Sequence, residues 1–435
     1  MSSLLPDPPK DDIGALKLHR WSDRAIVVVA LITLASGFGQ FGVVAALGDV
    51  STQLGHVAPG SSIADKVGLS GTSIGIGLAI IRLASLGSLP LIGIADRLGR
   101  RRVLLTVTIA GLALTAVAAT SPGYWWFVVI FACGRPLLSA TNALAEVMGA
   151  EETGASDRAA AVALVSAGYA VGAGLSAIVH SLASGVLGFR GICALALVPL
   201  ALVWVLRGWV EEPSRFTAAE ASTDHPTPVL GAIGRRYRGR VAILALIALT
   251  ISIITGPANS FVFLYAQDVL HMPGYMTALM VVVAGACGFG GLLCGRWAAD
   301  HVGRRPTSTV ALVGAALSAT FAYSGSRPAL LIGYSLGVIS GSLLAPAVGA
   351  LLTELFPTSV RASVTGWWVV SGVVGAVVGL VWFGAVADVG NRFELAAELT
   401  FLPTAAGAAL FWLLPETMGR EPEALWPTAD GASPT

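Results

Sequence analysis

Apolar runs of about twenty residues recur along the whole sequence, and they constrain the fold more than any other feature. Backbone polar groups cannot reach water inside a bilayer core of about 30 Å, so a chain that crosses it forms helices of about 20 apolar residues. The runs lie at residues 25–47, 67–95, 103–147 with a break at 121–123, 159–189, 191–206, 241–267, 274–295, 306–326, 328–353, 362–387 and 395–414. They predict an all-α membrane protein of twelve transmembrane helices in two six-helix bundles.

Composition agrees with this prediction. Only 12% of the residues are charged, against about 25% in a soluble domain. A formal net charge of +1 gives no electrostatic reason to expect a nucleic-acid partner. The four cysteines lie in apolar runs without the spacing of a zinc site or a disulfide framework. We therefore expect the lipid bilayer as partner, and neither metal nor cofactor.

The basic residues predict how the chain is oriented. Most of the 26 Lys and Arg residues lie in segments that share one side of the membrane if both termini are cytoplasmic. We expect a multi-pass protein of the cell inner (plasma) membrane, without a cleaved signal peptide. The predicted organisation is an N-terminal tail (1–24), a bundle (25–206), a cytoplasmic linker (207–240), a second bundle (241–414) and a C-terminal tail (415–435).

A charged motif occurs twice, once in each half. Residues 96–101 read Asp-Arg-Leu-Gly-Arg-Arg and residues 300–305 read Asp-His-Val-Gly-Arg-Arg. Further along each half an acid and an arginine recur with the same spacing, Glu151 with Arg158 and Glu354 with Arg361. Such repetition predicts two homologous halves.

These residues resemble the major facilitator superfamily, especially its sugar and metabolite:proton branches. The resemblance rests on the repeated loop, on Glu-Leu-Phe-Pro-Thr-Ser-Val-Arg at 354–361, and on Pro-Glu-Thr at 415–417, and it covers nearly the whole chain. The glycine that the family places four residues before the loop aspartate is displaced by one in both halves. The resemblance implies parallel six-helix repeats and a secondary transporter that works by alternating access.

The repeated charges predict a latch at the cytoplasmic face, where a carboxylate and arginines can form charge-assisted hydrogen bonds. The resemblance implies that Asp96 meets the start of helix eleven, while Arg100 or Arg101 meets an acid such as Glu151, and that the latch breaks on opening inward. The alternative is that these arginines serve only topology. The predicted gating residues are Asp96, Arg97, Arg100, Arg101, Glu151, Arg158, Asp300, Arg304, Arg305, Glu354 and Arg361.

Charges at bilayer depth are costly and usually face a cavity, which makes Arg82 and Arg135 the leading site candidates. Buried guanidinium groups favour a carboxylate or phosphate, and the resemblance places Arg135 in a helix that lines the substrate path. The alternative is that Arg135 pairs internally with Glu146, or bonds backbone carbonyls, as a structural element; the same structural alternative applies to Arg82. We therefore expect a small organic anion as substrate. The predicted substrate-binding residues are Arg135, Gln40, Asn142, Asn259, Arg82 and Tyr169.

Proton-coupled symport is the energy source that the resemblance implies. Helix one has Gln40 near the position where many aromatic-acid symporters carry an acid, so the titrating group has to lie elsewhere. The candidates are Glu146, Asp49 and His180, with Asp268 beside them, and each has the alternative of a helix-end or interfacial residue.

Two other functions stay open at this stage. One is a drug or metabolite exporter of the same fold, and the other is a non-transporting membrane sensor. No catalytic triad, metal cluster or P-loop motif favours an enzyme or an ATP-driven pump. We expect a monomer.

Overall fold

The structure of the chain, a computed structural model, describes residues 19–55, 68–154, 157–212, 234–390 and 392–420. Every named element in these residues is helical. The helices before residue 213 are α1 (Arg24–Ala45), α2 (Leu47–Leu54), α4 (Gly71–Ala84), η2 (Ser85–Gly87), α5 (Ser88–Leu98), α6 (Arg100–Val117), η3 (Ala118–Thr120), α7 (Tyr124–Glu152), α8 (Arg158–Leu195), α9 (Leu197–Leu206) and η4 (Arg207–Trp209). Those after residue 233 are η5 (Arg235–Tyr237), α11 (Arg238–Ser260), α12 (Val262–Leu264), η6 (Tyr265–Val269), α13 (Gly274–His301), α14 (Arg304–Ala322), α15 (Arg327–Glu354), α16 (Thr358–Gly390), α17 (Phe393–Thr404) and η7 (Ala405–Leu413).

Eleven helical stretches in the described residues are long and apolar enough to cross a membrane. The remaining expected span, at residues 306–326, corresponds to α14. This helix has 19 residues, but it opens with Arg304, Arg305 and Pro306 and carries several hydroxyl side chains, which lower its hydropathy. The predicted all-α membrane fold is therefore confirmed, and the arrangement is consistent with twelve spans.

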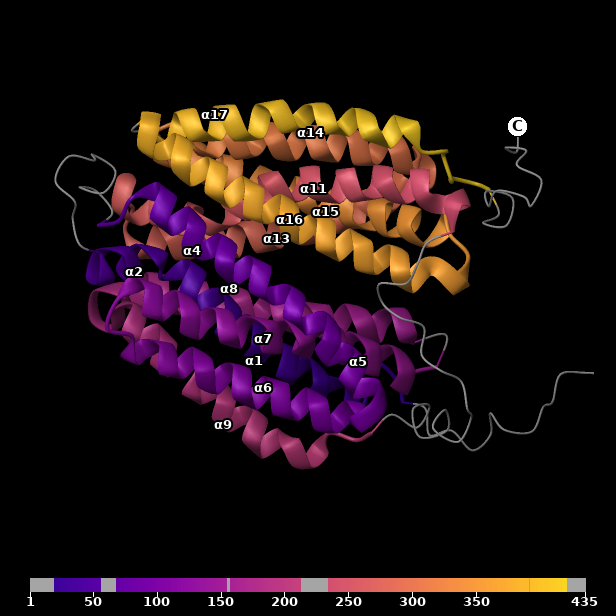
Figure 1. Cartoon of the computed structure of the whole chain (residues 1–435), viewed down its shortest axis with the longest axis horizontal. Helices are drawn as coiled ribbons and strands as arrows, with labels where there is room; N and C mark the ends of the chain where they lie inside the picture. The colour runs from indigo at the N-terminus through magenta and orange to yellow at the C-terminus, as the bar shows by residue number, and fades with distance from the viewer. Residues whose placement is uncertain (1–18, 56–67, 155–156, 213–233, 391, 421–435) are drawn as a thin grey trace, which may run out of the picture.

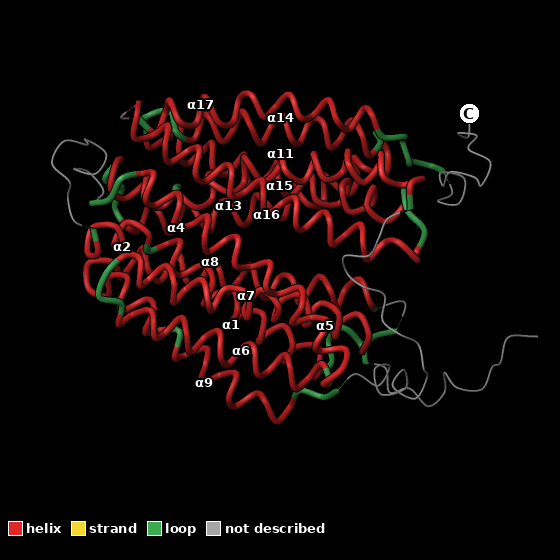
Figure 2. The backbone as a smooth tube through the Cα atoms, viewed as in Figure 1, coloured by secondary structure: helices red, strands yellow, loops and turns green. Residues whose placement is uncertain are grey.

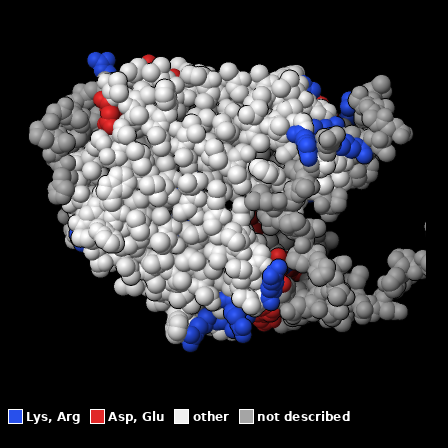
Figure 3. Space-filling view, in the orientation of Figure 1, with Lys and Arg blue, Asp and Glu red and all other residues white. Residues whose placement is uncertain are grey.

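The helices form two groups, one from α1 to α9 and the other from α11 to η7 (Figures 1 and 2). Within the first group α1 packs along α8, and within the second α13 packs on α15 and α11 on α16. The groups contact each other mainly where α4 packs on α16 and α8 on α13. They meet at the start of α4, which we call the closed end, and part at Gly99 and Gly303, the open end. Figure 3 shows the hollow between them at the open end.

Glycines allow α4 and α16 to cross closely near the closed end. A Cβ atom placed on Gly75 would lie 2.4 Å from the carbonyl oxygen of Leu380, and one on Gly384 would lie 2.1 Å from the carbonyl oxygen of Gly71. Small residues at a membrane-helix crossing let the two backbones approach and pack by van der Waals contact. This crossing joins the two halves.

The helix α8 contains a sharp break that separates two spans. Gly188 adopts φ 50° and ψ −169°, which is not helical. A side chain there would be strained by the positive φ and would also meet Nε2 of Gln53 at 2.7 Å. Glycine at this position thus lets the chain turn between the two helical segments of α8.

Tryptophan side chains are exposed at both ends of the molecule. Trp125 and Trp126 begin α7 at the closed end, and Trp204, Trp209 and Trp412 lie at the open end; all five are about half exposed or more. Amphipathic indole rings gather at the two membrane–water interfaces. The two sets therefore fit the two borders of a bilayer.

Candidate functional site

A cavity of about 290 Å³ lies between the two helix groups. The helices α1, α4, α7 and α8 supply one part of its wall, and α11 and α16 supply the other. Its lining is Phe41, Val43, Val44, Leu78, Ile81, Arg82, Phe131, Arg135, Tyr169, Thr255, Gly256, Asn259, Ser260 and Leu380. Because both halves line it, a movement of one half against the other changes its shape and access.

Arg82 and Arg135 bring two guanidinium groups into this cavity, together with the phenol of Tyr169. The Nε atom of each arginine is buried without a hydrogen-bond partner in the described part of the chain. Glu146, the acid expected to pair with Arg135 in the structural alternative, instead accepts a hydrogen bond from Oγ of Ser166 at 3.0 Å. Cations buried without a carboxylate are costly, so an anionic ligand would stabilise this arrangement.

A second cavity of about 270 Å³ adjoins the first and reaches into the C-terminal half. Thr255 and Asn259 line both cavities. The wall of the second is formed mostly by small and apolar side chains, with the aromatic rings of Tyr323 and Tyr334. The two cavities together offer a cationic part and an apolar part, which suits a ligand with an anionic group and an apolar body.

Two of the predicted binding residues lie outside both cavities. Gln40 is only 2% exposed, and its Nε2 donates to Oγ of Ser36 at 2.9 Å and to the carbonyl oxygen of Leu138 at 3.1 Å. It therefore ties α1 to α7. Asn142 lies further along α7, and its Oδ1 atom is buried without a partner among the described residues.

At the closed end the carboxylate of Asp388 in α16 caps the start of α4. Its Oδ1 accepts from the backbone N–H of Gly71 at 2.7 Å, and its Oδ2 accepts from the N–H and the hydroxyl of Thr72 at 2.8 and 2.5 Å. A carboxylate is favoured at a helix N-terminus because the first N–H groups lack partners within the helix. This cap joins the halves, and sequence reasoning missed it because Asp388 stands alone at the end of an apolar run.

A second polar cluster at the closed end contains two of the predicted proton-coupling residues. Nε2 of the fully buried His180 lies 2.7 Å from Oδ2 of Asp49. Asp268 approaches the same place from the other half, since a Cβ atom on Gly48 would lie 2.1 Å from its Oδ2. Oδ2 of Asp268 and Nδ1 of His180 are buried without partners in the described part of the chain.

At the open end Arg100 holds the predicted charges of the first half together. Its guanidinium group pairs with Glu151 and, at 3.3 Å, with Asp96. Glu212 completes the arrangement, because its carboxylate accepts the backbone N–H groups of Arg100 and Arg101 at the start of α6. Asp96 thus bonds Arg100 within its own half, and among the described side chains no bond between Asp96 and the start of α16 is found.

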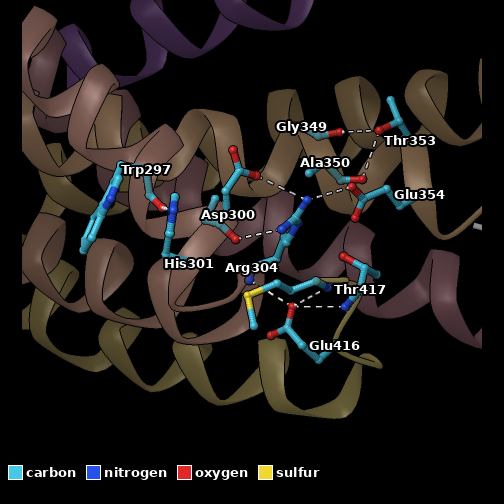
Figure 4. A network of polar contacts seen from close by, with 12 residues as sticks. Trp297, Asp300, His301, Arg304, Gly349, Ala350, Thr353, Glu354, Glu416 and Thr417 are labelled. Carbon is cyan, nitrogen blue, oxygen red and sulfur yellow. Dashed lines mark hydrogen bonds and ion pairs between the residues drawn. The ribbon is translucent and has the colours of Figure 1, made fainter. Parts of the chain in front are cut away.

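The second half repeats this network (Figure 4). Arg304 pairs with Asp300 at 3.4 Å and with Glu354 at 3.1 Å. Glu416 accepts the backbone N–H groups of Arg304 and Arg305 at 2.9 and 3.0 Å. Each capping glutamate lies 112 residues beyond the arginine amide that it binds, Glu212 from Arg100 and Glu416 from Arg304.

Sequence reasoning missed Glu212 and Glu416 as network members, although their equal spacing from the repeated arginines was a usable signal. Gly99 and Gly303, with φ 95° and 122°, precede the two capped helices. A Cβ atom on either glycine would lie about 3 Å from the capping carboxylate. The glycines of the repeated motif therefore leave room for the cap.

The remaining predicted gating residues lie around these networks. Arg101 donates to the carbonyl oxygen of Arg207 at 3.3 Å, and Arg305 donates to that of Trp412 at 2.8 Å. Arg361 closes the turn between α15 and α16 by donating to the carbonyl oxygen of Thr353. The side chain of Arg97 is exposed. Arg158 begins α8, and its side chain lies outside what the structure describes.

The model of the Major Facilitator Superfamily matches residues 29–319 and 279–432. The chain belongs to the major facilitator superfamily. It is therefore a membrane transport protein rather than an enzyme.

Relatives agree with this family membership. The chain is 25% identical to a putative metabolite transport protein of Haemophilus influenzae over 75% of this chain and 83% of that one. It is 25% identical to a gallate transporter of Pseudomonas putida over 93% and 94%. Among solved structures, the inward-open xylose transporter XylE of E. coli aligns with a TM-score of 0.73 at 18% identity, covering 92% of this chain and 98% of that one. The facilitator fold and a role in solute transport follow.

Proposed function

We propose that the protein carries a small organic anion, specifically a carboxylate, across the inner membrane by alternating access. The observation that carries this proposal is the pair of buried guanidinium groups of Arg82 and Arg135 in a cavity that both halves line. A guanidinium group offers a planar fork of donors that matches a carboxylate. A relative named as a gallate transporter supports the same class of substrate, since gallate is a carboxylate.

The ligand would lie with its anionic group at Arg135, Arg82 and Tyr169 and its apolar part toward Tyr323 and Tyr334 in the adjoining cavity. Asn259 lines both cavities and would select polar substituents on the ligand. Gln40 would act through packing, because its hydrogen bond to the carbonyl oxygen of Leu138 holds α1 against α7, while its bond to Ser36 lies within α1.

Protons would drive the transport through the cluster of Asp49, His180 and Asp268. The two carboxylates come from different halves and approach each other around Gly48 at the closed end. Like charges brought together in a buried interface repel, and one bound proton relieves that repulsion. Proton binding would therefore favour closure of this end, which links the proton to the movement of the halves.

The open end would face the cytoplasm, in the orientation that the basic residues favour. In the opposite conformation Asp96 would meet the start of α16. The networks around Arg100 and Arg304 would stabilise the packing of neighbouring helices within each half. The chain would act as a monomer, with the halves limited by residues 25–206 and 241–414. An exporter of the same fold is the second candidate, because the cavity geometry is compatible with either direction.

Uptake into proteoliposomes tests the substrate class. The panel contains aliphatic and aromatic carboxylates, sugars and cationic dyes, each with and without an imposed pH gradient. We expect carboxylate uptake, lowered about tenfold to a hundredfold in Arg135→Ala because charge-assisted hydrogen bonds are lost. The exposed Arg296 in α13 supplies the control Arg296→Ala, which should transport normally. Uptake of sugars or dyes without carboxylates would contradict the proposal.

Counterflow exchange separates proton coupling from substrate binding. Asp268→Asn should abolish accumulation driven by the pH gradient while exchange of labelled for unlabelled carboxylate continues without a gradient. If accumulation is unchanged in Asp268→Asn and in His180→Gln, this cluster is excluded as the site of proton coupling. That result would not contradict the proposed substrate site.

A further inference from the structure

A groove of about 590 Å³ lies on the outer side of the first half, between α6 and η4, the short helix that follows α9; it shares no lining residue with the central cavity. Its basic residues are Arg101, Arg102 and Arg207, and none of the described residues that line it is acidic. Figure 1 shows α6 and α9 at the outer edge of this half, and Figure 3 shows Lys and Arg side chains gathered at that edge near the open end. The groove thus faces the surroundings of the helix bundle.

The groove changes from charged to apolar along α6. Leu105 and Ile109 follow Arg101 at intervals of four residues, so they lie below it on the same helix face. At 1.5 Å per residue this face extends about 12 Å from the charged rim toward the middle of the membrane. A ligand with an anionic head and an apolar tail, held parallel to the helix axis, fits this order.

The guanidinium groups of the rim are available for such a ligand. Arg207 lies over the exposed ring of Trp204, 3.6 Å from its centroid, and no ion pair of Arg207 with a described acid is found. Arg102 is exposed, and no hydrogen bond or ion pair of its guanidinium group is found with another described residue. The carboxylate of Glu212, which belongs to the network, accepts the backbone N–H groups of Arg100 and Arg101.

The second half gives an internal comparison. Arg305 bonds the carbonyl oxygen of Trp412 as Arg101 bonds that of Arg207. At the neighbouring positions, however, the second half has Pro306 instead of Arg102 and Trp412 itself instead of Arg207. The cluster of three arginines is therefore specific to the first half and is not required by the shared helix cap.

We propose that this groove binds one anionic phospholipid, with the phosphate diester between Arg102 and Arg207 and one acyl chain along Leu105 and Ile109. The exposed Trp204 and Trp209 place the rim at the level of the headgroups. Basic pockets between membrane helices bind anionic headgroups, and each arginine near an anionic surface strengthens the attraction. The bound lipid neutralises the rim beside the Arg100 network.

Native mass spectrometry of the purified full-length protein in a neutral detergent tests this proposal. Phosphatidylglycerol, phosphatidylcholine with the same acyl chains, and inorganic phosphate are titrated separately. We expect one phosphatidylglycerol to bind at least about tenfold more tightly than phosphatidylcholine, and the double variant Arg102→Ala/Arg207→Ala to weaken its binding about thirtyfold. Arg296→Ala, an arginine outside the groove on α13, should leave the binding unchanged.

Each other outcome overturns the proposal. Equal binding of the two lipids, or unchanged binding in the double variant, would show that the groove does not select an anionic lipid. Inorganic phosphate that competes as well as the lipid would indicate a site for a free anion. If the double variant unfolds, Arg102→Gln alone serves, because its guanidinium group bonds no other described residue; binding as in the wild type would then count against the lipid site.

Discussion

Asp388, near the end of α16, caps the backbone N–H of Thr72 at the start of α4, and this bond crosses from one half of the transporter to the other. The same carboxylate also holds the N–H of Gly71 and the hydroxyl of Thr72. A helix cap normally stabilises its own helix. Here the capping group belongs to the opposite half, so the bonds exist only while this end is closed.

We expect Asp388→Ala to favour the conformation in which this end is open. Loss of the cap should cost about 1–2 kcal/mol, a factor of about five to thirty in the equilibrium between the two conformations. Labelling of a single cysteine introduced in the cavity, with a membrane-impermeant thiol reagent added from each side, measures the shift. Thr72→Val keeps the backbone bonds and removes only the hydroxyl bond, so it should shift the equilibrium less. Equal labelling in Asp388→Ala and the wild type would contradict this role.

The crossing of α4 and α16 gives a prediction that depends on size alone. In Gly75→Ala the new methyl group would lie 2.4 Å from the carbonyl oxygen of Leu380, so the two backbones have to separate. We expect slower transport and a smaller closed population, with an overpacking cost of about 1–3 kcal/mol. Gly93→Ala in α5 is the matched control, because nothing lies within 4 Å of a Cβ atom there. Similar transport rates for the two variants would disprove the requirement for glycine at the crossing.

The spans and the members of the repeated networks could be predicted from the sequence, because the spans depend on local composition and the charged motif occurs twice. The resemblance implied that Arg100 or Arg101 meets Glu151; the structure has Arg100 there, and it pairs Arg304 with Glu354 in the second half. Glu212 and Glu416 were missed, although each lies at an equal distance along the chain from its partner.

The contacts between halves, and the rotation of each helix about its own axis, could not be predicted in the same way. The role of Asp388 depends on which helix of the other half it meets, and an isolated acid in an apolar run carries no information on that. Gln40 was expected in the cavity, but the rotation of α1, a helix apolar on almost every side, turns it toward the backbone of α7. Such rotations are set by tertiary packing rather than by periodicity.

The pair of Arg100 and Glu151 should couple in a double-mutant cycle. Both side chains are largely shielded, 14% and 25% exposed, so their interaction is less screened than that of a surface pair. We expect a coupling of about 1–2 kcal/mol in the thermal unfolding of Arg100→Ala, Glu151→Ala and the double variant. The same cycle with the exposed Arg97 in place of Arg100 should give a coupling near zero. If the coupling between Arg100 and Glu151 is also near zero, the charges serve only to set the membrane topology.

The pKa of Glu416 in the second network predicts how the stability of the fold depends on pH. Burial by itself raises the pKa of this carboxyl, but the backbone N–H groups of Arg305, Arg304, Met418 and Thr417 donate to it, and the net pKa lies below the ordinary value of 4.5. A carboxylate with a depressed pKa stabilises the fold above its unfolded-state pKa, and this contribution is lost as the pH falls through the folded-state pKa. Because the group is partly exposed, we expect a contribution below about 1 kcal/mol.

The variant Glu416→Gln should therefore melt at a lower temperature than the wild type at pH 7, and the difference should narrow as the pH falls below about 4.5. Thermal unfolding in the same detergent at a series of pH values gives both curves. A difference for Glu416→Gln that stays constant down to pH 3 would show that the shape of the side chain, rather than its charge at the start of α14, stabilises the network.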